Sequence, residues 1–314
     1  MSNCLVTGGA GFIGSNLCKE LLARGHHVKV IDNLSTGKMI NISPFIDKIE
    51  FINGDLRFIK DAKNACRDVD YIFHEAALPS VARSVENPIA TNDSNISGTL
   101  NLLVAAKEAK VKRVVYAGSS SVYGNSPILP KNEDMKPEPL SPYAVSKLTG
   151  EYYCSVFSSL YGIETVTIRY FNVFGPNQDP SSQYSGVISI FITKLLQGKN
   201  PTILGDGRQS RDFTFVKNVV EGNILAATVP LAANKIINIA CGARTDLNQL
   251  VNNLNEILNS NIQPVYADER PGDVKHSQAD ISLARKILGY NPVCSFKDGV
   301  IETVKWYKNS VAIS

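Results

Sequence analysis

Tyr143 and Lys147 stand four residues apart in the run Tyr-Ala-Val-Ser-Lys. On a helix this spacing places a phenol and an ammonium group on one face. A free tyrosine has a pKa of about 10 and is a poor base at neutral pH. The charge of Lys147 would favour the phenolate and lower the pKa of Tyr143. The pair is therefore a candidate acid/base centre.

An ordinary surface contact also explains a tyrosine and a lysine at this spacing, but two neighbouring features favour acid/base chemistry. The proline-containing loop 139–142 directly precedes the pair and would fix the start of its helix. A serine-rich run, 118–124, follows a predicted strand, at the edge where doubly wound sheets bind ligands. Ser119 in this run offers a hydroxyl group to the substrate oxygen from which Tyr143 removes a proton.

Three glycines, Gly8, Gly11 and Gly14, lie between the first predicted strand and the first predicted helix. Their spacing allows a tight turn, a close approach of backbone amides to a pyrophosphate, and close packing of helix on strand. Asp32 ends the second predicted strand, where a carboxylate binds the adenosine ribose and repels a 2′-phosphate. These residues predict NAD rather than NADP, and the positive nicotinamide ring would add to the effect of Lys147 on Tyr143. Asp55 and Leu56, after the third strand, would hold the adenine.

The first half of the chain must position these groups, and it alternates short β-rich runs with helical patterns. We predict strands at 4–7, 28–32, 49–53, 71–74, 114–117 and 164–169, and helices at 11–24, 90–109 and 143–160. Such alternation requires right-handed crossovers and gives a parallel sheet covered on both faces. The predicted fold class is α/β, a doubly wound Rossmann sheet.

The pattern changes after Gly175. Segment 176–186 is loop-like, and helical patterns return at 217–228, 245–258, 281–288 and 296–308. Because the connections there are too irregular to continue the alternation, we expect a smaller C-terminal α/β substrate lobe over the carboxyl ends of the strands.

The composition excludes several other classes of protein. The chain has 314 residues, 44% of them hydrophobic, and a formal net charge of +3, which is too small to predict nucleic acid as a partner. No apolar run approaches the ~20 residues of a membrane span. The six cysteines show no Cys-x-x-Cys spacing and the four histidines no metal spacing, so we predict reduced thiols, no metal and a cytoplasmic location.

Taken together, the motifs resemble the extended short-chain dehydrogenase/reductase superfamily and, within it, the nucleotide-sugar 4-epimerases, especially those that act on UDP-N-acetylglucosamine. The resemblance runs nearly end to end. Besides the glycine loop, the serine run and the Tyr143/Lys147 pair, it includes the segments 32–33, 74–77, 95–99, 169–176, 205–207, 211–213 and 270–273.

The resemblance implies a cofactor site and a division of the chain. Its NAD-binding residues would be Gly8, Gly11, Phe12, Ile13, Asp32, Asn33, Asp55, Leu56, Ala76, Ala77, Asn95, Tyr143, Lys147 and Tyr170. Residues 1–171, with a returning segment near 212–240, would form the NAD-binding domain. Residues 172–211 and 241–314 would form the nucleotide-sugar lobe.

The resemblance also implies roles at the substrate. Ser119, Tyr143 and Lys147 occupy the catalytic positions of the family. The substrate-binding residues would be Ser80, Ser119, Ser121, Asn172, Gly186, Val187, Thr202, Leu204, Arg211, Arg270, Asp273 and Ser277. Guanidinium groups suit a diphosphate because their planar donors pair with two oxygens at once.

The implied reaction is inversion at C4 of a UDP-hexose through a 4-keto intermediate, with NAD regenerated in each cycle. The sister 4,6-dehydratases carry an acidic pair where this chain has Ser120 and Ser121, which cannot move protons at C5 and C6. A UDP-glucuronate 4-epimerase is the alternative, although those enzymes usually carry threonine at the position of Asn172. A non-catalytic NAD-binding scaffold is a second alternative, but it predicts loss of the Ser119, Tyr143 or Lys147 side chain.

Ser277 bears on the choice of sugar. It stands where galactose-specific relatives carry a bulky tyrosine, so a serine leaves room for a 2-N-acetyl group. We therefore expect interconversion of UDP-GlcNAc and UDP-GalNAc, with UDP-Glc and UDP-Gal also accepted. The helices predicted at 90–109 and 143–160 resemble those that pair across a two-fold axis in the family, which implies a homodimer.

Overall fold

A seven-stranded parallel sheet forms the centre of the computed structural model, which describes residues 1–179, 186–269 and 275–311. The strand order is β11-β6-β5-β4-β1-β2-β3. The strands are β1 (Asn3–Thr7), β2 (His27–Asp32), β3 (Ile49–Asn53), β4 (Tyr71–His74), β5 (Arg113–Ser119), β6 (Glu164–Tyr170) and β11 (Lys235–Ile239). The order reverses between β1 and β4, so the carboxyl ends of these two strands flank the ligand crevice of a doubly wound fold.

Side chains of the central strands alternate between two hydrophobic clusters. Leu5, Ile72 and Val114 belong to one cluster, whereas their neighbours Val6, Phe73 and Val115 belong to the other. Because successive side chains of a strand point to opposite faces, both faces of the sheet are buried. The continuous apolar runs of the sequence have this origin.

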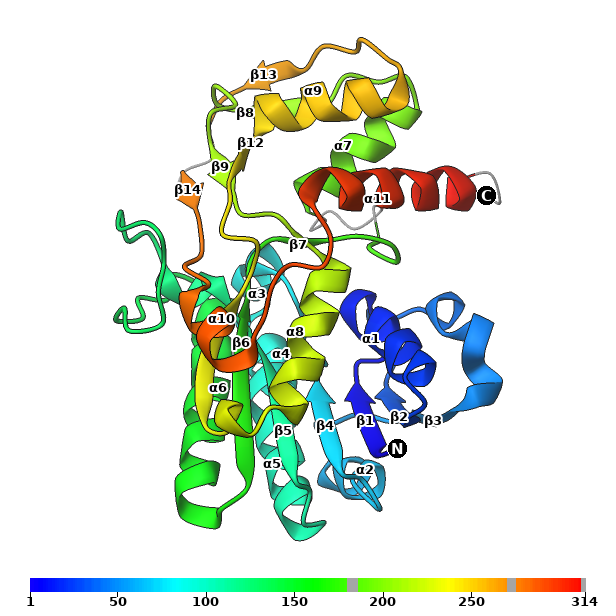
Figure 1. Ribbon diagram of the computed structural model, residues 1–314, viewed down its shortest axis with the longest axis vertical. Helices are drawn as coiled ribbons and strands as arrows, with labels where there is room; N and C mark the ends of the chain where they lie inside the picture. Colours follow the sequence, from blue (N-terminus) through cyan, green and yellow to red (C-terminus); the bar gives the residue numbers. More distant parts are fainter. Residues whose placement is uncertain (180–185, 270–274, 312–314) are drawn as a thin grey trace.

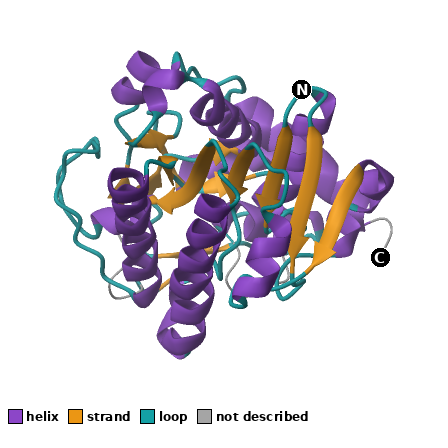
Figure 2. Cartoon of the chain, turned by 90° about the horizontal axis from the view of Figure 1, so that it is seen from below, coloured by secondary structure: helices purple, strands orange, loops and turns teal. Residues whose placement is uncertain are grey.

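Helices cover the two faces, as Figure 2 shows from below. One cluster includes residues of α2 (Ile59–Ala65), α5 (Gly98–Glu108) and α6 (Pro142–Tyr161). The other includes residues of α1 (Phe12–Ala23), α8 (Val216–Thr228) and α10 (Ser282–Leu288). The short helices α3 (Val81–Glu86) and α4 (Pro88–Asn92) lead from β4 toward α5. The predicted α/β doubly wound class is thereby confirmed.

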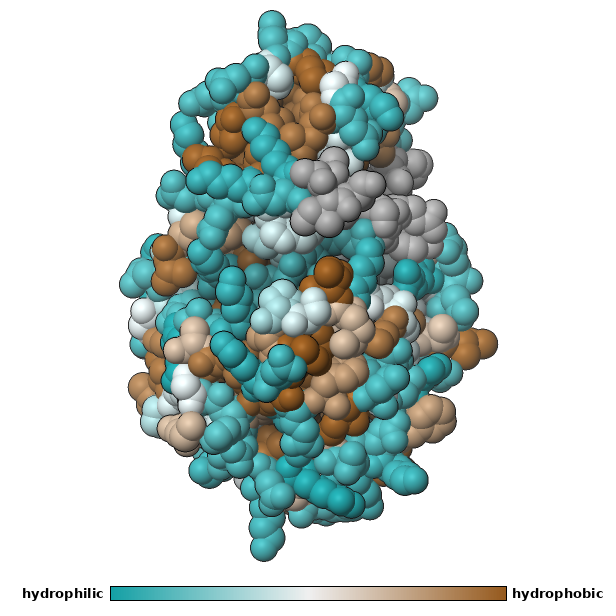
Figure 3. Space-filling view, turned by 90° about the vertical axis from the view of Figure 1, so that its right-hand side faces the viewer, coloured by the Kyte–Doolittle hydropathy of each residue, from teal (hydrophilic) through white to brown (hydrophobic). Residues whose placement is uncertain are grey.

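A smaller lobe stands over the carboxyl ends of the main strands (Figure 1), and the space-filling view in Figure 3 shows this narrower part above a broader body. Its helices are α7 (Val187–Leu196), α9 (Leu247–Leu258) and α11 (Phe296–Val311). Its short strands pair as β8 (Thr202–Leu204) with β13 (Val265–Ala267), and as β9 (Ser210–Arg211) with β12 (Thr245–Asp246) and β14 (His276–Ser277).

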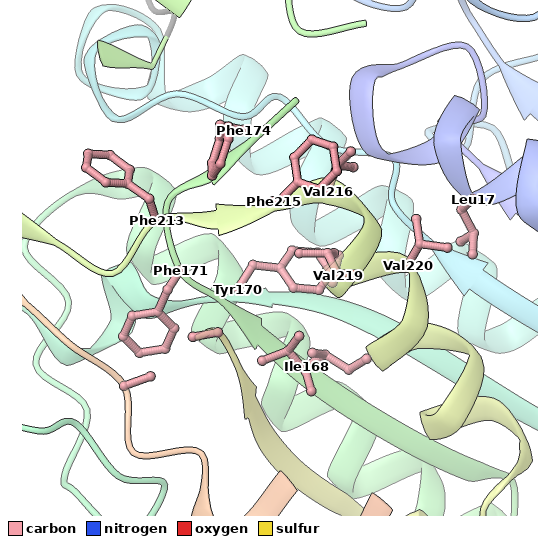
Figure 4. Packing of buried hydrophobic residues seen from close by; sticks show 14 of the residues in the cluster. Leu17, Ile168, Tyr170, Phe171, Phe174, Phe213, Phe215, Val216, Val219 and Val220 are labelled. Atoms are coloured by element: carbon pink, nitrogen blue, oxygen red, sulfur yellow. The ribbon is translucent and has the colours of Figure 1, made fainter. Parts of the chain in front are cut away.

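An aromatic cluster joins the lobe to the sheet. The strand pair β7 (Val173–Phe174) and β10 (Thr214–Phe215) leaves the end of β6. The ring of Phe174 lies 5.5 Å from that of Phe215, 6.5 Å from that of Phe213 and 5.7 Å from that of Phe296, at the start of α11. Figure 4 shows this packing, with the ring of Tyr170 directed toward α8. The rings fix the position of the lobe above the crevice.

Several predicted elements differ in detail. The helix predicted over 90–109 is divided by a π-helical turn, Asp93–Ser97. The helix predicted over 245–258 begins at Leu247, because Asp246 caps it with a reciprocal pair of bonds to Gln249, and Thr245 and Asp246 form β12 instead. Neither α7 nor β11 was predicted, and β11 extends the sheet beyond β6.

No helix in the described part of the chain is long and apolar enough to span a membrane. Within residues 1–179, 186–269 and 275–311, no group of three or more His, Cys, Asp or Glu side chains is placed to hold a metal ion. All six cysteines are free thiols, and four of them are buried.

Candidate active site

The glycine loop between β1 and α1 packs against the segment that follows β4. Gly8 has a φ of 68°, and a Cβ atom there would lie 2.8 Å from the Cα atom of Ala76, so this close approach requires glycine. A Cβ atom on Gly14 would overlap the carbonyl oxygen of Gly8, so α1 begins directly on the loop. Phe12 and Ile13, in the first turn of α1, line the adjoining cavity. The positive end of the helix therefore faces that cavity.

This cavity, of about 680 Å³, runs along the carboxyl ends of β1, β2 and β4. Ten of the predicted cofactor residues line it: Gly8, Gly11, Phe12, Ile13, Asp32, Asn33, Asp55, Leu56, Ala76 and Ala77. A helix N-terminus, a glycine loop and carboxylates at the far end are the groups that a dinucleotide needs. The residues present therefore fit NAD.

Asp32 is buried, and its two oxygens accept hydrogen bonds from the backbone amides of Ala10 (2.9 Å) and Leu34 (2.8 Å). Its burial raises the pKa of the carboxyl group, whereas the two amides lower it. Asp32 thus holds the glycine loop to the end of β2. Each oxygen keeps a second lone pair for a ribose hydroxyl.

Asp55 lies at the same end of the cavity and stays ionised. Arg57 forms an ion pair with it at 2.6 Å, and the amide of Asn33 donates to it at 2.9 Å. The hydrogen bonds from Arg57 are the main reason why the pKa of Asp55 falls to about 2. An anionic acceptor is therefore present beside Leu56, where we predicted the adenine.

Asn95 lies in the π-helical turn and does not line the cavity. Its Nδ2 atom donates to the Ser146 hydroxyl (3.0 Å) and to the carbonyl of Leu78 (3.3 Å), and its Oδ1 atom accepts from the amide of Leu78 (2.7 Å). Ser146 in turn donates to the carbonyl of Tyr143. Asn95 therefore ties the segment after β4 to the helix that carries Tyr143, and its role toward the cofactor stays a prediction.

A second buried network joins the same elements. The Thr7 hydroxyl lies 2.8 Å from Nδ1 of His74, and Nε2 of His74 lies 2.8 Å from the Thr99 hydroxyl. The amide of Ala76 donates to Thr7 at 3.1 Å. Burial lowers the pKa of His74 to about 3, so the ring is neutral at pH 7. His74 is a structural link between β1, β4 and α5.

The three predicted catalytic residues come together at the ends of β5 and α6. Ser119 ends β5, and its side chain lies near enough to Tyr143 to lower the pKa of the phenol. Lys147 is buried, and its Nζ atom donates to the carbonyl of Ala117 at 2.8 Å. Nearby, the hydroxyl oxygen of Ser121 is buried and makes no hydrogen bond to any described residue. It can therefore accept or donate to a substrate oxygen.

The pKa of Tyr143 differs from our expectation. Burial raises it, the bond from Ser119 lowers it, and the negative charge of Glu75 raises it further, so the net direction is upward. Burial also lowers the pKa of Lys147. The expectation of a lowered Tyr143 pKa was wrong for the protein alone, because burial and the Glu75 charge together outweigh the effect of Ser119. The positive nicotinamide ring is the remaining charge that favours the phenolate.

A second cavity, of about 440 Å³, lies between the lobe and the sheet. Six of the predicted substrate residues line it: Asn172, Gly186, Val187, Thr202, Leu204 and Arg211. Val173, Gln178 and Gly186 line both cavities, so the two adjoin. A long ligand with a diphosphate in its middle suits this arrangement, since Arg211 and the N-terminus of α7 both face the second cavity.

The remaining predicted substrate residues that the structure describes are not among those that line the second cavity. Arg270 and Asp273 fall outside the described residues. Ser80 lines the first cavity, but its hydroxyl caps α3 by accepting from the amide of Arg83 at 3.1 Å. Ser277 is half-buried in β14, paired with Arg211 of β9, and is not among the residues that line either cavity.

The structure adds residues to which we had assigned no role. Lys275 lines the second cavity beside Arg211. Lys38 and Asp179 form an ion pair at 2.6 Å and both line the first cavity, so they connect its two sides. Glu75 also lines the first cavity and accepts a hydrogen bond from Tyr170 at 2.6 Å. Glu75 belongs to the segment 74–77 named among the sequence motifs, but only its hydrogen bond from Tyr170 in the folded protein indicates a role.

Comparison with known proteins agrees with this geometry. Residues 4–240 match the model of the NAD dependent epimerase/dehydratase family. A putative UDP-glucose 4-epimerase of Methanocaldococcus jannaschii is 40% identical over 308 residues, which are 98% of each chain.

Two solved structures are similar over nearly their whole length. A UDP-N-acetylglucosamine 4-epimerase of Methanobrevibacter ruminantium, in complex with UDP-N-acetylmuramic acid, has a TM-score of 0.94 and 43% identity over 98% of this chain and 99% of that one. A UDP-glucuronic acid 4-epimerase of Bacillus cereus, with UDP-glucuronic acid and NAD, has a TM-score of 0.90 and 33% identity over the same shares. This chain therefore belongs to the NAD dependent epimerase/dehydratase family, and NAD is its cofactor.

Proposed function

We propose that the protein inverts C4 of a UDP-hexose and that its preferred pair is UDP-GlcNAc and UDP-GalNAc. The observation that carries the proposal is that Ser119, at the end of β5, interacts with Tyr143 at the start of α6, with Lys147 one helical turn further along that helix. This arrangement supports proton removal from a sugar hydroxyl beside a dinucleotide. The relatives named as 4-epimerases support the choice of C4.

In the proposed reaction Tyr143 accepts the proton of the C4 hydroxyl, while Ser119 and Ser121 hold the C4 oxygen. NAD, when bound, accepts the hydride of C4 and later returns it. Arg211 and Lys275 hold the diphosphate while the 4-keto sugar turns and presents the opposite face of C4 for return of the hydride, and Tyr143 gives its proton back to the C4 oxygen. Because one group removes and returns the proton, no second acid is needed.

Ser277 supports the preference for N-acetylated sugars. Ser277 is paired in β14 with Arg211 of β9, which lines the second cavity, and a serine is much smaller than the tyrosine of galactose-specific relatives. The similar enzyme of Methanobrevibacter ruminantium is named for UDP-N-acetylglucosamine, which favours the same choice.

The identity of the product tests the proposed substrate preference. The purified protein is incubated separately with UDP-GlcNAc, UDP-Glc and UDP-glucuronate, and the products are separated by chromatography. We expect conversion of UDP-GlcNAc with the highest kcat/KM. Conversion of UDP-glucuronate alone would make the protein a uronate epimerase.

The variant Ser277→Tyr tests whether the size of residue 277 selects between N-acetylated and plain hexoses. We expect at least a tenfold loss of kcat/KM on UDP-GlcNAc, about 1.4 kcal/mol, with a smaller loss on UDP-Glc, which lacks the N-acetyl group. Ser282→Tyr, on the exposed start of α10, is the matched control and should leave both values unchanged. An equal loss on both substrates would contradict a gating role for Ser277.

We also propose the division into an NAD-binding domain (1–171 with 212–240) and a nucleotide-sugar lobe (172–211 and 241–314), which is supported by the pairing of β11 with β6. A homodimer is supported by exposed apolar side chains on α6, among them Tyr152 and Val156. The six free thiols support a reducing compartment, and we propose the cytoplasm.

A further inference from the structure

Glu75 is a carboxyl group inside the candidate site that the proposed reaction does not use. It directly follows β4 and lines the cofactor cavity. His74 is paired with Tyr116 of β5, so Glu75 comes next to Ala117, whose carbonyl oxygen accepts the hydrogen bond of Lys147. The carboxyl group and the ammonium group therefore lie at the same pair of strand ends.

Tyr170 holds Glu75 in this place from β6. Its hydroxyl donates to Oε1 of Glu75 at 2.6 Å, and Nδ2 of Asn223 donates to the Tyr170 oxygen at 2.8 Å. Tyr170 is itself the ladder partner of Ser119. The side chain of Tyr170 thus crosses the end of β5 to reach Glu75, and a short bond to a carboxylate is a strong one.

The charges around Glu75 act in opposite directions on Tyr143. The titratable groups that interact with Glu75 are Tyr143 and Lys147 on α6, Tyr170 on β6 and Cys18 on α1, and the neighbouring His74 is neutral. Burial raises the pKa of Glu75, and although Tyr170 and Lys147 lower it, the net pKa is about 7. The Glu75 charge in turn raises the pKa values of Tyr143 and Lys147.

We propose that Glu75 is a positioning residue of the acid/base pair: held by Tyr170, its carboxylate balances the Lys147 ammonium and so sets the pH at which Tyr143 ionises. Burial lowers the pKa of Lys147 to about 8, and the negative charges of Glu75 and Glu151 oppose a further loss of its proton. The same negative group holds Tyr143 as a phenol until cofactor and substrate are bound. A neutral side chain at position 75 would remove the negative charge that keeps Tyr143 protonated.

The test is the titration of Tyr143 in the NAD-loaded protein. Tyrosinate absorbance is followed against pH by ultraviolet difference spectroscopy, and the signal of a Tyr143→Phe variant is subtracted. Glu75→Gln keeps the side-chain size and the oxygen that accepts from Tyr170, but removes the charge. We expect it to move the Tyr143 midpoint down by about one pH unit, with the acid limb of kcat moving the same way. An unchanged midpoint overturns the proposal.

Two further variants complete the experiment. Glu75→Asp keeps the charge and should restore a midpoint near that of the wild type, and a midpoint equal to that of Glu75→Gln would overturn the proposal. Glu108→Gln, exposed on α5 and paired with Lys63, makes the same chemical change far from the site and should shift nothing. The proposal rests on Tyr143 as the acid/base, but the titration requires no turnover. A protein that shows the shift and turns over no UDP-sugar would refute the proposed function and leave the role of Glu75 standing.

Discussion

At the scale of single residues, Ser119 lies at the end of β5, and Tyr143 and Lys147 lie four residues apart on α6. The sequence predicted these positions, and the catalytic roles of the three residues are proposals. The electrostatics could not be predicted, because the pKa of Tyr143 depends on burial and on Glu75, a residue 68 positions away in the chain. Spacing locates a group, whereas its pKa is a property of the folded surroundings.

Tyr143→Phe removes the hydroxyl group that we propose exchanges a proton with the substrate. We expect turnover to fall by about 10²–10⁴-fold, with the free energy of unfolding nearly unchanged, because only one half-buried hydroxyl is lost. Tyr161→Phe, exposed at the end of the same helix, is the matched control. Product formation measured by chromatography checks both. Turnover within a factor of three of the wild type would show that another group is the base.

At the scale of elements, long periodic segments could be predicted and local irregularities could not. Helix α6 has nearly the predicted bounds, whereas the π-helical turn in the helix predicted over 90–109 leaves no mark in hydrophobic periodicity. That turn places Asn95 between Leu78 and Ser146, so this residue links two elements, which the sequence did not indicate. Strand β11 is a short apolar run, which periodicity cannot distinguish from part of a helix.

The His74 network gives the fold a dependence on pH. The pKa of His74 is lowered from 6.5 to about 3, so between these values the unfolded chain binds a proton that the folded protein excludes. This contribution to stability is complete above pH 6.5 and is lost as the pH falls toward 3. From pH 6.5 to 5 the loss is about 2 kcal/mol.

Urea unfolding of wild type and His74→Gln at pH 7 and pH 5 checks this expectation. The variant, which has no imidazole to protonate, should lose less stability on acidification than the wild type. His27→Gln, exposed at the start of β2, should behave like the wild type. If His74→Gln and the wild type lose stability equally, His74 is not the source of the acid sensitivity.

At the scale of the whole molecule, α6 carries an apolar surface that the chain itself does not cover. Val145, Tyr152, Val156 and Leu160 are between 45% and 69% exposed, and Val85 and Ile89 of the neighbouring α3 and α4 are 65% and 74% exposed. Side chains that recur at helical spacing on one face are typical of an interface between subunits. Within α5 itself, which the structure describes in full, no large apolar side chain is among the exposed ones, so the predicted contribution of that helix shifts to α3 and α4.

Val156→Glu should break such an interface. A charge on each of two symmetric copies would be desolvated without a partner, so we expect at least a tenfold weaker dimer. Light scattering over a dilution series measures the change. Leu231→Glu, which charges an exposed apolar residue outside α3, α4 and α6, should leave the assembly as it is. A monomeric wild-type protein would refute the homodimer.

The wall that the two cavities share has a thermodynamic consequence. Val173, Gln178 and Gly186 line both cavities, so a ligand that shifts these residues from one side would alter the binding energy of a ligand on the other side. Such coupling is reciprocal: if bound NAD tightens the sugar nucleotide tenfold, the sugar nucleotide tightens NAD tenfold, about 1.4 kcal/mol in each direction. The affinity for NAD would then depend on the concentration of the sugar nucleotide. At a low concentration of sugar nucleotide, the protein would bind NAD less tightly.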